Sequence, residues 1–404
     1  MEIAYALLII YLIAPYVGLF YFESSGERII YGDANSAIWP YSIYLLIFFA
    51  IVLLFNLNNK AKLTVFSIYP EWLARKIIKR CICILIFCIG MMFVYGVGNM
   101  LTGETGRGEF RSTLGGLGFF YILFSLFFPA SCVAISAQMW VKSRSRKIGL
   151  WFALCFFLGF ICGFLTGFKF TCFLISTPGL ILAAPRLGVT KIFFVLALSI
   201  AFMLFSATYF MGLDTLDALN YLIQRGTVVA VSGTVGVWNN FRDGGPDAIY
   251  TLLYALGNKA ASFLIGEPVD SFNFLKVNLT RYIGYLTYPK PEEALSGAFN
   301  LTVTNFGEAV YFFGESFSWV FAIISGLITA FMLRSAKKAI CNGSDIKAIV
   351  LVNFLALVIF PWLLNSMIGN LFGIPTIIYF TFVILLVNNC TKPLRDWRRS
   401  QAIN

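Results

Sequence analysis

The chain lacks several of the residues and motifs on which enzymes most often rely. It has no histidine, the side chain that most often moves protons near neutral pH and binds transition metals. It also lacks the GxxxxGK[ST], HExxH and Asp-x-Asp patterns of nucleotide and zinc sites. Its nine cysteines form no C-x-x-C pair. We therefore predict neither a metal site nor a bound cofactor, and any reaction would depend on fixed cations, carboxylates and tyrosines.

Two cations lie where an anionic ligand could meet them. Lys169 is the only charged residue between Ile148 and Pro185, and a lone cation in such a stretch either snorkels to the membrane interface or meets an anion. Arg225 precedes a long uncharged run, 226–241, and is either an interfacial anchor or a phosphate ligand. The other basic residues on the same predicted side are Arg28, Arg107, Arg111, Arg242, Lys259, Lys276, Arg281 and Lys290.

The composition indicates which elements must position these residues. Hydrophobic residues make up 59% of the chain and charged residues only 12%, about half the charged fraction of a soluble domain. A bilayer core needs about 20 apolar residues per helix, and the uncharged stretches predict about ten transmembrane helices. We place them at 2–23, 33–60, 80–104, 111–142, 147–169, 169–186, 191–214 and 315–334, the last of these with its start near Val310. Two more lie in 348–391 and are separated at Gly369-Asn370 and Gly373–Pro375. We thus expect an all-α integral membrane protein with a single polytopic domain, 1–404.

The distribution of charge predicts the orientation. Most lysines and arginines fall in 60–80, 142–147, 186–191, 334–347 and 392–399, which alternate with less basic loops. Basic loops face the cytoplasm, so both termini are predicted to be cytoplasmic. The net charge of +11 is then a topology signal, and short juxtamembrane clusters do not favour a nucleic-acid partner.

One external segment is far longer than the other loops. Residues 214–309, between the predicted helices seven and eight, carry seven aromatic residues that we single out: Trp238, Phe241, Tyr250, Tyr254, Tyr282, Tyr285 and Tyr288. Ile249, Leu252, Leu253 and Leu256 fall at helical spacing, which suits a helix on the membrane surface. Long ordered loops on a rigid scaffold often carry function.

Two short stretches resemble a known family. Residues 301–314 read T-x-x-G-E-x-x-Y-x-x-G from Thr304 and run into an apolar helix. This resembles the Gly-Glu stretch that re-enters the membrane in Wzy-type O-antigen and oligosaccharide repeat-unit polymerases. The turn 166–169 is similar to the family's Gly-x-Arg stretch, with Lys169 in place of arginine. Two Arg-x10-Gly pairs, at Arg107 and Arg225, have a spacing expected by chance in a chain with this much Arg and Gly.

The resemblance implies a glycosyltransferase of the bacterial inner membrane. Such enzymes join undecaprenyl-pyrophosphate-linked oligosaccharides into O-antigen or a similar surface polysaccharide at the periplasmic face, without a metal. Pyrophosphate is a good leaving group, so fixed cations suffice where charge develops, and a carboxylate can take the proton of the attacking hydroxyl. Membrane lipid and a chain-length regulator protein are further candidate partners. The resemblance makes Glu308 and Arg225 candidate catalytic residues, and the candidate substrate or pyrophosphate ligands are Lys169, Arg225, Arg281, Arg107, Arg242 and Tyr311.

Other interpretations remain open. Asn305 could cap the helix that follows, which would place Glu308 at the third helical position, bonded back to the cap; Glu315 would then lie on the same helix face as Glu308, two turns away. An O-antigen ligase or another lipid-linked glycosyltransferase is the nearest alternative function, although such ligases typically use a periplasmic histidine. A transporter or flippase would more often show paired repeats, and a membrane scaffold needs no site at all.

Overall fold

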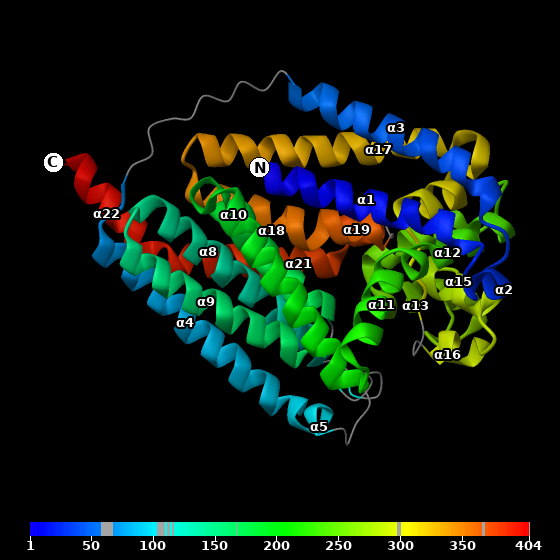
Figure 1. The fold of residues 1–404 in the computed structure, drawn as a ribbon, viewed down its shortest axis with the longest axis horizontal. Coiled ribbons are helices and arrows are strands. Elements are labelled where there is room, and N and C mark those ends of the chain that lie inside the picture. Colours follow the sequence, from blue (N-terminus) through cyan, green and yellow to red (C-terminus); the bar gives the residue numbers. More distant parts are fainter. Residues whose placement is uncertain are drawn as a thin grey trace.

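The computed structural model describes the chain apart from residues 58–67, 103–109, 111–113, 115–116, 168, 297–299, 366–367 and 404. The backbone alone is described for residues 28, 169, 402–403 and much of 189–211. Within these limits every regular element is a helix, as the sequence predicts. Most of the helices run along the long axis of an elongated bundle (Figure 1).

The helices fall into three groups along the chain. The first group contains α1 (Glu2–Phe22), α2 (Glu27–Tyr31), α3 (Asn35–Leu57), α4 (Glu71–Val94), α5 (Val97–Leu101), α7 (Gly118–Ile122), η2 (Leu123–Phe127), α8 (Phe128–Ser143), α9 (Arg146–Leu165) and α10 (Lys169–Met211). The second contains α11 (Thr215–Gly226), α12 (Val228–Asn240), η3 (Ala248–Leu256), α13 (Asn258–Ile265), α14 (Phe272–Leu275), α15 (Leu279–Thr287) and α16 (Pro291–Ser296). The third contains α17 (Asn305–Cys341), α18 (Asp345–Phe354), η4 (Leu355–Ile359), α19 (Phe360–Leu364), α20 (Gly369–Phe372), α21 (Ile374–Cys390) and α22 (Lys392–Ile403).

The described residues include eight helices long and apolar enough to cross a membrane, or nine if the bent pair α21 and α22 forms one span. The fold is therefore that of an all-helical, multi-pass membrane protein. The expected seventh span, 191–214, falls in the part of α10 beyond Gly188, most of whose side chains are not described. The count of ten stays a prediction.

Several predicted boundaries are wrong. The third span begins at Glu71 rather than at residue 80, because Lys76, Lys79 and Arg80 extend from the exposed side of α4 while the opposite side is buried, as long basic side chains can. The predicted loop 186–191 contains the break between two helical parts of α10, at Gly188 (φ 69°), where the sixth candidate span ends. The eighth span is α17, which begins at Asn305 rather than near Val310, ends at Cys341 rather than at Arg334, and is broken at Gly314 (φ 69°). Both glycines adopt the left-handed conformation that other residues rarely take.

The helix α8 lies at the centre of the bundle. It packs against α4, α9, α10 and α18, and its residues 129–139 are all buried. Gly159 on α9 and Gly179 on α10 allow this close approach. A Cβ atom at Gly159 would lie 2.7 Å from one methyl group of Val133, and a Cβ atom at Gly179 would lie 2.5 Å from the other methyl group. Small residues at helix contacts are how membrane helices gain van der Waals packing.

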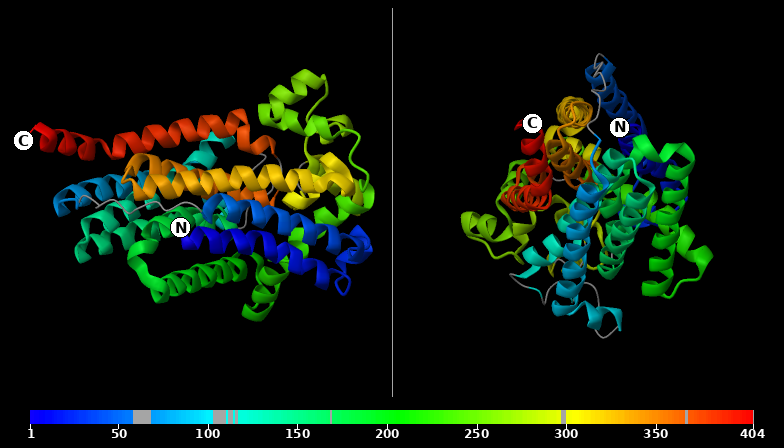
Figure 2. Two further views of the ribbon diagram at one scale, coloured as in Figure 1. Left: turned by 90° about the horizontal axis from the view of Figure 1, so that it is seen from above. Right: turned by 90° about the vertical axis from the view of Figure 1, so that its left-hand side faces the viewer.

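The 215–304 segment gathers at one end of the bundle, and α22 projects from the other (Figures 1 and 2). The stretch expected to lie on the membrane surface forms η3 and then α13, where Ile249 and Phe263 are 73% and 87% exposed. The long apolar run near the C-terminus breaks between Leu364 and Ile374, with α20 inside the break. This confirms the interruption expected from its glycines and proline.

Candidate functional site

Arg225 borders a cavity of about 300 Å³ between α2, α11 and the chain before α17, which we call the Arg225 cavity. Its helix, α11, begins where Asp214 accepts a hydrogen bond from the Asp217 N–H at 2.8 Å, a capping contact. At the other end Arg225 complements the negative end of the helix dipole. Further polar residues of the lining are Glu27, Tyr31, Tyr221, Gln224, Tyr288, Asn300 and Thr302.

Glu27, in α2, faces the same cavity as Arg225. Burial raises the pKa of the Glu27 carboxyl, and the charge of Arg225 lowers it by a smaller amount. Burial also raises the pKa of Tyr31, one turn later in α2. The cavity thus combines a cation with a carboxyl group that holds its proton more tightly than usual, an arrangement that often marks functional sites.

A larger groove with a mixed polar and apolar lining adjoins the Arg225 cavity. The groove has a volume of about 730 Å³ and runs beside the C-terminal half of α1. Val17 and Tyr21 of α1 line one side, and Ile223 of α11 lines the other. Glu27 and Gln224 line both spaces, so the two are contiguous. We call this space the α1 groove. The pair offers a charged end and a wider extension in which Val17, Ile223 and Val228 form the apolar part of the lining.

Arg242 does not line the Arg225 cavity. Its Nε donates to a carboxylate oxygen of Glu315, its guanidinium lies 5.0 Å from the centre of the Trp238 ring, and its carbonyl accepts from the Glu315 N–H at 2.7 Å. The hydrogen bond to Glu315 raises the pKa of Arg242. Arg242 therefore fastens the chain after α12 to the kink of α17.

Arg281 and Tyr311 are also held away from the Arg225 cavity. Arg281 is buried in α15, and it donates to the carbonyls of Ala294, at 3.0 Å, and Leu295. This burial lowers its pKa. Tyr311 is fully buried in α17, with its ring edge-on to Phe241 at 5.1 Å between centroids. Both side chains hold the 215–304 segment together.

Two other candidates cannot be placed. Arg107 lies outside the described residues, and so does the side chain of Lys169, the residue that begins α10. Their assignment as pyrophosphate ligands stays a prediction.

Glu308 is 1% exposed, and its carboxylate bridges two parts of the chain. One oxygen accepts from the Trp362 indole N–H at 3.1 Å, and the other accepts from the Ile368 N–H at 2.6 Å. The expected cap is wrong: Thr304, not Asn305, caps α17, because the Thr304 hydroxyl accepts from the Gly307 N–H at 3.5 Å. Glu308 therefore sits one position beyond the expected one and bonds outward.

The expected alignment of Glu308 with Glu315 on one continuous helix face is also wrong. Gly314 interrupts the helix between them. Glu308 is buried, whereas Glu315 is partly exposed and paired with Arg242. The two carboxylates thus have separate partners.

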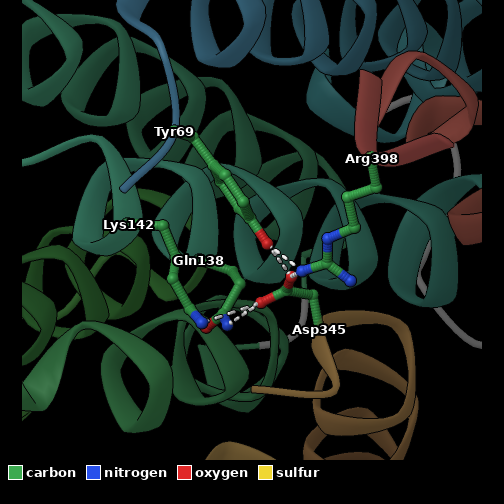
Figure 3. A network of polar contacts seen from close by, with 5 residues as sticks. All are labelled: Tyr69, Gln138, Lys142, Asp345 and Arg398. Carbon is green, nitrogen blue, oxygen red and sulfur yellow. Dashed lines mark hydrogen bonds and ion pairs between the residues drawn. The ribbon is translucent and has the colours of Figure 1, made fainter. Parts of the chain in front are cut away.

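A buried polar network lies at the opposite end of the bundle (Figure 3). Asp345, 1% exposed at the start of α18, accepts from Gln138 Nε2 at 2.6 Å and from Arg398 Nη2 at 2.6 Å, and its carboxylate lies 3.5 Å from Lys142 Nζ. The Tyr69 hydroxyl donates to the same carboxylate. The network joins α8, α18, α22 and the chain before α4, so the basic segments 69–80, 142–147 and 392–399 meet at one end.

The sequence interpretation missed Glu27 and this network. Glu27 stands next to Arg28 in a short loop between two spans, where a charged pair resembles an ordinary solvated turn. Lys142 and Asp345 resemble boundary charges for the same reason. Their burial depends on contacts between residues far apart in the chain, and no local pattern signals it.

No protein-family model matches the chain, and neither a curated protein nor a solved structure does. The functional argument therefore depends on the geometry of the cavities and on the stretches 301–314 and 166–169.

Proposed function

We propose that this protein is a membrane glycosyltransferase that polymerises undecaprenyl-pyrophosphate-linked oligosaccharide units into O-antigen or a similar polysaccharide. In this proposal it crosses the bacterial inner membrane about ten times, with both termini in the cytoplasm and residues 214–309 in the periplasm. The meeting of basic segments at the α22 end supports this orientation, because basic loops stay on the cytoplasmic side.

The observation that carries the proposal is the contiguity of the Arg225 cavity and the α1 groove. A polyprenyl pyrophosphate is an amphiphile with a compact anionic head and an apolar chain. The guanidinium of Arg225 offers a planar, bidentate match to phosphate oxygens. The apolar part of the α1 groove, formed by Val17, Ile223 and Val228, suits the first units of the lipid.

The reaction would follow from this placement. A hydroxyl oxygen of the acceptor glycan attacks the anomeric carbon of the donor glycan and forms the new C–O bond. The bond between that carbon and the pyrophosphate oxygen breaks, and its electron pair leaves with undecaprenyl pyrophosphate, whose charge Arg225 stabilises. A carboxylate takes the hydroxyl proton. Glu27 lines the Arg225 cavity and Glu308 does not, so we add Glu27 to Glu308 as a candidate base.

The proposal is tested with Arg225→Ala, Arg225→Lys and a matched control, Lys290→Ala, in cells whose long glycan depends on this gene. Lys290 is an exposed basic residue of the same segment and pairs only with nearby Glu293 among the described contacts. We expect Arg225→Ala to collapse the ladder of glycan bands on a gel to single units, and Arg225→Lys to restore it poorly because a point charge lacks the planar fork. The control should keep the full ladder.

The outcomes also separate the alternatives. A normal ladder in Arg225→Ala, at wild-type protein level in the membrane, would reject the role of Arg225. Gene loss that leaves polymer length unchanged but prevents its attachment to the lipid anchor would favour a ligase. Gene loss that traps lipid-linked single units on the cytoplasmic side would favour a flippase.

A further inference from the structure

A separate cavity lies where α19 ends and α21 begins. It has a volume of about 400 Å³ and is bordered by the break in the chain, by η3 and by the first residue of α13. We call it the break cavity. Its volume falls in the range of about 300–1,000 Å³ typical of sites for small ligands. Polar residues of its lining are Asn258, Asn365, Asn370, Thr376, Tyr254 and Tyr379.

The lining has the chemistry of a site for an uncharged, hydroxyl-rich ligand. None of the described residues that border the break cavity is an Asp, Glu, Lys or Arg. Three primary amides contribute both donors and acceptors, which match sugar hydroxyls because each hydroxyl also donates and accepts. Phe127, Pro361 and Trp362 add an apolar wall against which the C–H face of a sugar ring can pack. A phosphate would find no cation among these described lining residues.

Glu308 sets the shape of this cavity from behind. Its two carboxylate oxygens hold Trp362, which precedes the break, and the Ile368 amide, which lies inside it. Glu308 is almost fully buried and is not part of the lining. A carboxylate in this position orients the wall of the cavity.

The break cavity and the Arg225 cavity are tied together by one short segment. Asn300, Leu301 and Thr302 line the Arg225 cavity, Thr304 caps α17, and Glu308 follows one turn later. Thr302 and Glu308 are six residues apart, and an extended chain spans at most about 3.6 Å per residue, so their Cα atoms lie within roughly 20 Å. A change at one cavity therefore has a short covalent path to the other.

We infer that the break cavity binds an uncharged sugar of the acceptor glycan, with Glu308 as the positioning residue for its Trp362 wall. The identification of this sugar as part of the acceptor rests on the proposed function. In that proposal the anionic leaving group lies beside Arg225, and the neutral end of the second glycan lies in a cavity whose described lining residues include no cation. The binding of an uncharged oligosaccharide follows from the lining alone.

The test is protection of a single thiol in the purified, full-length protein. Of the native cysteines only Cys83 is exposed and Cys341 partly so, while the other seven are buried, so replacing these two with serine leaves a background with little reaction toward an impermeant maleimide. Asn258→Cys then reports on the break cavity. Asn273→Cys is the matched control, because Asn273 is exposed in the same segment, bonded to Glu267, and outside the cavity.

The probes are the oligosaccharide repeat unit released from its lipid and inorganic pyrophosphate. We expect the oligosaccharide to slow labelling of Asn258→Cys several-fold and to leave Asn273→Cys unchanged, and pyrophosphate to slow neither. Equal labelling of Asn258→Cys with and without the oligosaccharide, in protein that makes polymer, would overturn the inference and leave the proposed function standing. Protection of Asn258→Cys, combined with a lack of polymer synthesis by the protein that retains Asn258, would retain the cavity and reject the polymerase.

Two variants test the positioning role. Trp362→Phe removes only the indole N–H donor, and Glu308→Gln replaces an acceptor oxygen with a donor. Each should raise the oligosaccharide concentration for half-protection about tenfold, the effect expected from one hydrogen bond to a charged group. The effect of the double variant should be smaller than the product of the two single effects, because both variants weaken the contact between Glu308 and Trp362. An unchanged half-protection concentration in Trp362→Phe would refute the positioning role even if Glu308→Gln fails to fold.

Discussion

Replacement of Asp345 by asparagine tests whether the polar network of Figure 3 stabilises the fold. The carboxylate is 1% exposed and accepts from Gln138 and Arg398 at 2.6 Å each, and it lies 3.5 Å from the Lys142 ammonium, whose side chain is 2% exposed. Asparagine preserves the volume, so the change leaves no cavity. It removes the charge that compensates a buried lysine.

The expected loss can be worked from the burial of each partner. Removing one member of a buried ion pair typically costs about 3–5 kcal/mol, because the other charge stays buried without compensation. The Arg398 side chain is 42% exposed, so water screens its ion pair with Asp345. Arg398→Ala should therefore cost only about 1 kcal/mol. We therefore expect Asp345→Asn to lower the free energy of unfolding by about 3 kcal/mol or more.

The measurement is reversible unfolding of the purified protein in detergent, with Glu71→Gln as the control. Glu71 pairs with Arg75 at 2.7 Å at the same end of the bundle, but the two side chains are 37% and 43% exposed. Because water screens such a pair, its loss should cost much less stability than the loss of the Asp345 carboxylate. The double variant Asp345→Asn with Lys142→Met should recover part of the stability, since no buried ammonium remains. The reasoning fails if Asp345→Asn is no less stable than Glu71→Gln.

Three further predictions follow from other contacts. Gly245→Ala should strongly destabilise the protein in thermal unfolding, because its Cβ atom would lie 2.1 Å from the buried Tyr311 ring; a wild-type melting temperature would contradict this packing. If Glu27 is the base, the polymerisation rate should fall on acidification at a pH above the ordinary carboxyl range, because burial raises the pKa of Glu27 and a base must be deprotonated. Glu27→Gln should abolish activity, and an active Glu27→Gln enzyme would exclude the role. In whole cells, an impermeant thiol reagent should label Ser271→Cys but not Ser400→Cys, and the reverse pattern would invert the topology.

The sequence by itself determined the class of fold. Stretches of about 20 uncharged apolar residues can satisfy their backbone in a bilayer only as helices, so the helical, multi-pass architecture was predictable. Local chemistry also placed some boundaries: Asp214 caps α11 where the long segment was expected to begin, and the glycines and proline at 369–375 interrupt the last apolar run. These features depend on residues close together in the chain.

Tertiary structure alone decided what the charged residues contact. A helix that is apolar on all sides, such as α1, does not encode which face is buried, so periodicity could not bring Glu27 and Arg225 to one cavity or Asp345 to Lys142. The same limit explains Glu308. Its Gly-Glu stretch was visible in the sequence, but its partners, Trp362 and Ile368, lie more than fifty residues away, and only the packing of α17 against the break between α19 and α21 brings them together.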